Sequence, residues 1–257
     1  MCIFSSNIVV NSTKILAADL GESLRPDCHL RLLAYQNSIV AETPNVMMLP
    51  IPSPTLDVYF HDTTQYAGFL DDLATRIAKE ENKRSRGSLT LSKSYQRVGQ
   101  YQYKMVEGSD VINELIALKQ PIQRWTWPMV DAYENWSWLF CIIDAGAEMK
   151  NQPLMISYDS FIEPLYFPMM DVHGHEYPKR FTERDQVLIV GEPEFTNPIA
   201  SGSEFEGFPY PQLKFGGSTI KRPRFDNGDC YANLTSTPDD PRFWEFTMAS
   251  NFEYEKV

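Results

Sequence analysis

Alternating apolar and polar residues mark most of the first 60 positions as β-structure. Apolar runs at 2–10 and 13–18 predict two short strands, which a polar turn at Asn11 and Ser12 would join. Longer runs at 29–42 and 45–51 predict two more strands, and prolines follow the second of them. Because these strands follow one another closely along the chain, we expect them to pair mostly in antiparallel fashion.

Three segments have the apolar spacing of helices instead. In the segment 65–82 apolar residues recur every three or four positions, which predicts a helix that covers a core. A second helix is predicted at 110–119, with Ser109 as its N-cap and Pro121 just beyond its end. A short third helix is predicted at 129–133.

The remaining apolar runs return to the strand pattern. A strand predicted at 95–106 precedes the second helix, and runs at 136–144 and 153–158 predict a hairpin. Further strands at 164–172 and 186–191 continue the sheet. The order of these elements predicts an α+β fold with a largely antiparallel sheet and two to three helices.

The character of the sequence changes after Gly191. We expect residues 1–191 to form one α+β core domain. Residues 192–257 contain seven of the chain's 18 prolines, yet they also carry many aromatic side chains. A disordered tail would lack those aromatics, so we predict an irregular extension that packs on the core or on a partner. Such an extension suits binding to a protein partner or self-assembly.

Charge and composition narrow the classes of function. The net charge is −11, from 34 acidic and 23 basic residues, which disfavours binding to nucleic acid. No run has the pattern of a signal peptide or the length of a membrane span. The four cysteines are scattered without a Cys-x-x-Cys pair, which favours a reducing compartment. We therefore expect a soluble protein, cytoplasmic or assembled in a particle.

Cys2 is the first candidate for chemistry. After removal of Met1 it would be an N-terminal nucleophile, whose free α-amine serves as the base. The start Met1-Cys2, with Asp19 at the end of the second predicted strand, resembles the N-terminal-nucleophile hydrolases of the choloylglycine type. In that family an arginine precedes the aspartate, whereas Ala18 stands here. The resemblance implies catalytic roles for Cys2 and Asp19; otherwise Cys2 is a small buried residue of a first strand.

A second candidate is a metal site at Asp171, His173 and His175. On a strand these three residues share one face, and a carboxylate with two imidazoles suits Zn²⁺ or Fe²⁺. The alternative is a pair of solvent-facing histidines at a turn, because Gly174 and Pro178 indicate that the strand ends here.

A third candidate is a group of four tryptophans. Such rings form platforms for sugars and nucleobases, but core packing is the favoured interpretation because aromatics dominate burial. The motifs of nucleotide-binding loops, serine hydrolases and zinc proteases do not occur in the sequence. The four residues are Trp125, Trp127, Trp136 and Trp138.

An ordered series of short motifs over residues 1–190 resembles an uncharacterised bacterial protein family. The series includes an MCIFS start, a Leu-Pro-x-Pro strand end, a Val-Gly-x-Tyr strand and a Tyr-Asp-Ser…Phe-Pro segment. Because no function is known for that family, the resemblance implies a fold unit and no reaction. The motifs are Met1–Ser5, Leu49–Pro52, Val98–Tyr101, Tyr158–Ser160 and Phe167–Pro168.

The sequence favours a soluble, non-catalytic protein that acts in binding or assembly, for example as a component of a virion. The absence of a complete catalytic constellation and the aromatic extension at 192–257 support this hypothesis. Two alternatives remain open: an amidohydrolase with Cys2 as its nucleophile, and a metal-binding domain at Asp171, His173 and His175.

Overall fold

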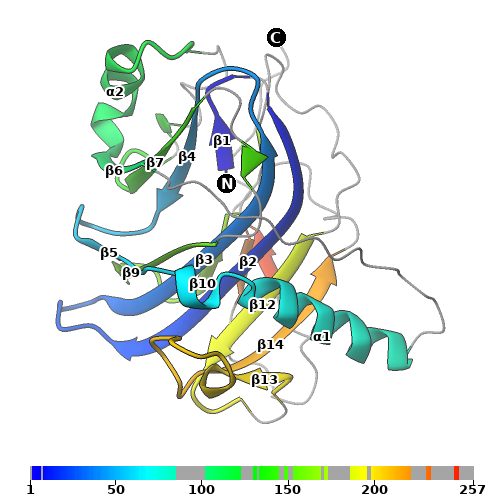
Figure 1. Cartoon of the computed structure of the whole chain (residues 1–257). Helices are drawn as coiled ribbons and strands as arrows, with labels where there is room; N and C mark the ends of the chain where they lie inside the picture. The colour runs from blue at the N-terminus through cyan, green and yellow to red at the C-terminus, as the bar shows by residue number, and fades with distance from the viewer. Residues whose placement is uncertain are drawn as a thin grey trace.

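In the described part of the chain, the computed structural model contains three sheets and the α-helices α1 and α2 (Figure 1). No helix among the residues that it describes is long and apolar enough to cross a membrane. The described residues are 2–6, 8–84, 102–122, 130–131, 133–144, 148–149, 153–168, 171–172, 186–195, 198–220, 230–232 and 246–248.

The largest sheet, here the large sheet, has eight strands. Seven of them follow one another, and β8 (Glu148–Met149) pairs with β3 beside that path. The seven are, in order, β13 (Ala200–Ser201), β14 (Lys214–Ile220), β12 (Gln186–Glu192), β2 (Val9–Glu22), β3 (His29–Val40), β9 (Leu154–Ser160) and β5 (Val58–Phe60).

A second sheet, here the small sheet, has five strands. Their order is β11 (Asp171–Val172), β1 (Cys2–Phe4), β4 (Asn45–Ile51), β7 (Ser137–Ile143) and β6 (Gln102–Glu107). A third sheet joins β10 (Leu165–Phe167), β15 (Cys230–Ala232) and β16 (Phe246–Met248).

The large and small sheets pack face to face. Successive side chains along each strand enter different clusters, one between the two sheets and one on the outer face. In β4, Met47, Leu49 and Ile51 belong to the core between the two sheets. Val46 and Met48 point to the opposite face of the small sheet, into a second cluster. Because successive side chains leave a strand on opposite faces, a strand that is buried throughout requires cover on both sides.

The two helices supply that cover. α2 (Val111–Ala117) buries Val111 and Leu115 against Trp138 and Phe140 on the outer face of the small sheet. α1 (Phe69–Arg84) packs on the outer face of the large sheet, as Figure 1 shows. The layers therefore run helix, sheet, sheet, helix. The α1 residues in that contact are Phe69, Leu70, Leu73 and Ile77.

The predicted α+β class and both long helices are confirmed, but the sheets are mixed. Most strand pairs among the described residues are antiparallel, as predicted, but β12 runs parallel to β2 and β1 runs parallel to β11. Parallel strands need a long connection, and 163 residues separate Glu22 from Gln186. Short-range patterns therefore carried no sign of this pairing.

Two local predictions are wrong. Asn11 and Ser12 are not a turn: β2 is continuous from Val9 to Glu22, with an irregular register against β3 between Asn11 and Lys14. A bulge of this kind accommodates polar residues without ending the strand. The hairpin of 136–144 with 153–158 does not form either, because β7 joins the small sheet and β9 the large sheet.

Part of the predicted extension is regular and belongs to the large sheet. β14 pairs with β12 along its whole length, and β13 pairs with β14. Between and beside these strands, Phe195, Phe208 and Phe215 are buried in the cores on the two faces of the sheet. These three aromatic residues thus pack on the rest of the chain.

Gly108 provides a test of how tightly α2 is joined to the small sheet. It begins the 3-10 turn η2 (Gly108–Asp110), and a Cβ atom there would collide with the backbone of Tyr133 and Glu134. We expect Gly108→Ala to lower the free energy of unfolding by about 1–3 kcal/mol, because backbone atoms cannot move aside cheaply.

Urea denaturation followed by circular dichroism measures this effect. Gly68→Ala is the matched control, since a Cβ atom at Gly68 has no neighbour within 4 Å. Equal midpoints for Gly108→Ala and the parent protein would contradict the described contact.

Candidate functional site

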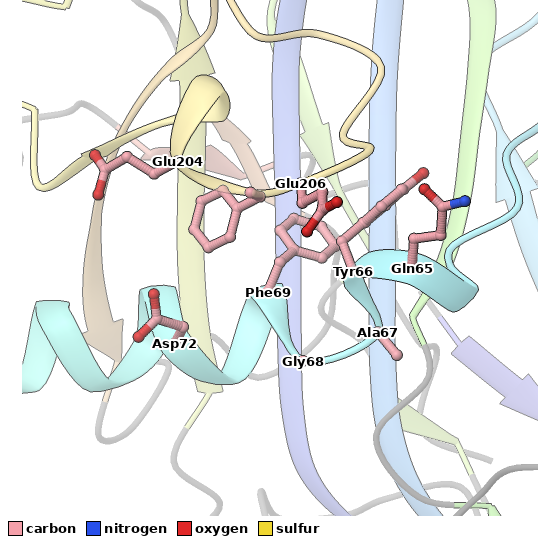
Figure 2. A pocket seen from close by; sticks show the side chains of 9 residues that line it. Gln65, Tyr66, Ala67, Gly68, Phe69, Asp72, Glu204 and Glu206 are labelled. Carbon is pink, nitrogen blue, oxygen red and sulfur yellow. The ribbon is translucent and has the colours of Figure 1, made fainter.

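A hollow of about 320 Å³ lies between the start of α1 and the segment 202–207. Figure 2 shows Glu204 and Glu206 on a segment that passes over the first turns of α1, where Phe69 and Asp72 lie. The wall on the side of η1 (Thr64–Tyr66) is formed by Gln65 and Tyr66. The hollow therefore unites parts of the chain that are more than 130 residues apart in sequence.

A local capping motif positions the wall of the hollow that the segment 202–207 forms. Ser201 caps the short helix η3 (Gly202–Glu204), and the Glu204 carboxylate accepts a hydrogen bond from the Ser201 amide at 2.7 Å. This reciprocal capping box holds Glu204 at the rim of the hollow. Ring contacts of Phe205 and Phe208 with Phe69, at centroid distances of 5.9 and 5.3 Å, fix the segment on α1.

One guanidinium is shared between two carboxylates of this site. Arg76 donates to Asp72 at 2.9 Å and to Glu204 at 2.6 Å, and it lies 5.9 Å from the centroid of the Phe205 ring. The hydrogen bond from Arg76 lowers the pKa of Glu204, and the same pair raises the pKa of Arg76. Glu206 adds a third carboxylate, so the hollow remains acidic and suits a cationic group.

His61 connects two elements beside this hollow. Its Nε2 atom lies 3.1 Å from the Ser157 hydroxyl on β9 and 3.3 Å from the Tyr210 hydroxyl. Burial lowers the pKa of His61, which favours the neutral ring. The neighbouring Asp62 carboxylate accepts hydrogen bonds from Thr64, at 3.0 Å from the amide and 2.6 Å from the hydroxyl. The Ser157–His61 pair therefore acts here as a link between β9 and the Tyr210 segment.

Asp19, a predicted catalytic residue, pairs with a buried arginine. Its carboxylate contacts the guanidinium of Arg31, which is only 4% exposed, on the neighbouring strand β3. Arg31 also donates to the carbonyl of Glu163 at 2.6 Å. Burial lowers the pKa of Arg31, while Asp19 opposes that change. Nearby, burial raises the pKa of Glu192, and the charges of Asp19 and Glu194 add to this.

Cys2 and Asp19, the predicted catalytic pair, lie in different sheets. Cys2 lies on β1 in the small sheet, and Asp19 lies on β2 in the large sheet. The backbone of Cys2 instead lies in register with Asp171 of the parallel strand β11. The side chains of Cys2 and Asp171 lie outside the described part of the chain.

Of the remaining predicted site residues, some lie outside the described part of the chain and others lie in its core. His173, His175, Trp125 and Trp127 lie outside the described residues. Within the described part, no group of three His, Cys, Asp or Glu side chains is placed to hold a metal ion. Trp138 is fully buried and donates to the Tyr133 carbonyl at 3.3 Å, which confirms its core role.

Sequence reasoning missed the hollow and the buried arginine. Alternation along 29–42 marked a strand but did not distinguish Arg31 from an outward-facing residue. The density of aromatic side chains at 205–210 was the only available signal for the hollow. Neither signal identified the partner segment across the fold.

The Asp19–Arg31 pair yields a stability test. We expect Asp19→Asn to lower the free energy of unfolding by about 2 kcal/mol, because it leaves the buried guanidinium without a compensating charge. Asp57→Asn, at a carboxylate whose side chain is 89% exposed, should change it little. Thermal melts at pH 7 measure both, and equal melting temperatures for the two variants would show that the pair contributes nothing.

Comparison with solved structures places the fold. The chain is similar to the crystal structure of baculovirus P35, with a TM-score of 0.54 and 16% identity over 96% of this chain and 88% of that chain. It is also similar to a mutated baculovirus P35 after caspase cleavage, with a TM-score of 0.44 and 17% identity over 70% and 66% of the two chains. No family model and no curated protein sequence matches. The first likeness shows that the chain shares its fold with baculovirus P35.

Proposed function

We propose that this chain is a non-catalytic, protein-binding component of a virus, and that its partner is a protease of the caspase class. The observation that carries the proposal is the fold likeness to baculovirus P35 over 96% of the chain. One of the P35 structures is of the protein after caspase cleavage, so a caspase acts on P35. A fold alone hosts many functions, so the site must supply further support.

The acidic hollow at the start of α1 supplies part of that support. Protein interfaces commonly centre on aromatic and arginine side chains that enter a pocket on the partner. Here Phe205 and Phe69 form an aromatic wall, and Asp72, Glu204 and Glu206 surround it. Arg76 already shows how a guanidinium is held at this place. A lysine or arginine of the partner would find the same chemistry beside Glu206.

The charge of the chain favours the same kind of partner. A net charge of −11 attracts basic surfaces and steers their approach, while it repels phosphate backbones and anionic membranes. The Ser157–His61 pair does not point to hydrolysis, because His61 is also engaged by Tyr210 and Asp62 is held by Thr64. Binding is therefore the better use of this surface than catalysis.

Purified caspases test the proposal directly. After incubation with the chain, we expect at least one enzyme of a panel to lose activity toward a small peptide substrate, in proportion to the chain added. Gel electrophoresis of the same mixtures would show a stable complex or a cleaved chain. Full activity across the panel, with an intact chain and no complex, would refute the proposal.

Charge reversal tests the role of the hollow in that complex. We expect Glu206→Lys to weaken binding of the inhibited caspase by about tenfold, because it repels the basic group that the hollow would receive. Glu194→Lys is the matched control, since Glu194 is also exposed but lies away from the hollow. Calorimetric titration measures both affinities. If the two variants weaken binding equally, the change in net charge explains the effect and the hollow has no role in the complex.

A further inference from the structure

Three exposed apolar side chains come from segments that adjoin one another at one end of the large sheet. Leu24 at the tip of the β2–β3 hairpin is fully exposed, and Leu56 and Phe161 are 40% and 38% exposed. They come from three segments, 22–28, 52–57 and 159–163. We call these three side chains the tip patch. Half of the six large exposed apolar residues found in the described chain belong to it.

Strand register brings the three segments together. Val58 lies opposite Tyr158 in the β5–β9 pair, and His29 lies opposite Ser160 in the β3–β9 pair. The start of β3, the end of β9 and the start of β5 therefore lie side by side, and the segments that adjoin them meet at the same end of the large sheet. The Phe161 amide donates to the Pro52 carbonyl at 3.1 Å, which joins two of the segments directly.

Arg25 ties the hairpin tip to the other two segments. Its guanidinium lies 3.4 Å from the Asp159 carboxylate and 3.9 Å from that of Asp57. The Ser23 hydroxyl donates to Asp159 at 2.7 Å and accepts from the Arg25 amide at 2.9 Å. The Cys28 amide donates to the Arg25 carbonyl at 3.3 Å. Leu24 therefore projects from a loop that is held on both sides.

A side chain held in this way binds at a low entropic cost. Ordering a flexible loop consumes part of the binding free energy, and a preorganised loop avoids this loss. Isolated exposed leucines are common on protein surfaces, but a group of three with a fixed loop is more typical of an interaction site.

The charges around the tip patch select its partner. The three segments carry five carboxylates, and Arg25 is their one basic residue. A second copy of the chain would bring two acidic rims together, and nucleic acid or an anionic membrane would also be repelled. A protein with an apolar pocket and a basic rim fits both features. The acidic residues are Glu22, Asp27, Asp57, Asp159 and Glu163.

We infer that the tip patch docks into an apolar pocket, rimmed by lysine or arginine, on the protease partner. The inference rests on the proposed function and adds a contact surface separate from the hollow at α1. Leu24 is its anchor, Leu56 and Phe161 extend the apolar contact, and the carboxylates orient the two proteins.

Affinity for the caspase that the chain inhibits tests this inference. We expect Leu24→Ser to weaken binding by about tenfold, since a leucine buried in a complex contributes more than one decade of affinity. Ile116→Ser is the matched control, because Ile116 is 59% exposed on α2, outside the three segments of the tip patch. Circular dichroism melts of both variants should match the parent protein. Wild-type affinity should also fall as salt is raised from 50 to about 300 mM, because rim charges are screened.

The outcomes separate this inference from the proposed function. A wild-type chain that binds no caspase of the panel overturns both. A wild-type chain that binds, with Leu24→Ser and Phe161→Ser binding equally well, overturns the docking surface alone. Light scattering tests whether a second copy of the chain binds the tip patch instead. A dimer of the wild-type chain that Leu24→Ser dissociates would assign the tip patch to that second copy and overturn the inference.

Discussion

Burial of both faces of the central strands is the constraint on which the rest of this structure depends. β4 and β7 place one row of side chains between the two sheets and the other row against α2. β2, β3 and β12 do the same between the small sheet and α1. A sheet with two apolar faces needs a cover on each, so four layers are the smallest arrangement that satisfies both sheets.

This arrangement also decides where function can be located. The interior faces are occupied by packing, so exposed chemistry is confined to strand ends, helix starts and the segments that connect them. The hollow at α1 forms where an aromatic segment packs on the first helical turns. The tip patch forms where three connections meet at the end of the large sheet. Both surfaces carry more acidic than basic side chains.

Polar groups inside the frame join its neighbouring elements. Asp19 compensates the charge of Arg31 between neighbouring strands, and His61 links β9 to the segment of Tyr210. Each of these groups looks like a candidate for catalysis when it is taken alone. Their partners show that they join elements that the apolar cores leave apart. The chain shares this frame with baculovirus P35.

Local periodicity determined much of this protein from its sequence alone. The apolar spacing in 65–82 and 110–119 predicted α1 and α2, and alternation predicted β3, β4 and β7, because these patterns depend on neighbours in the chain. Only the tertiary structure decided that β7 and β9 belong to different sheets, that β12 runs parallel to β2, and that Asp19 meets Arg31. It likewise decided that Arg76 joins Glu204 to Asp72 and that Arg25 pairs with Asp159. These contacts connect residues far apart in sequence, and short-range hydrophobic patterns contain no information on which distant segments will pair.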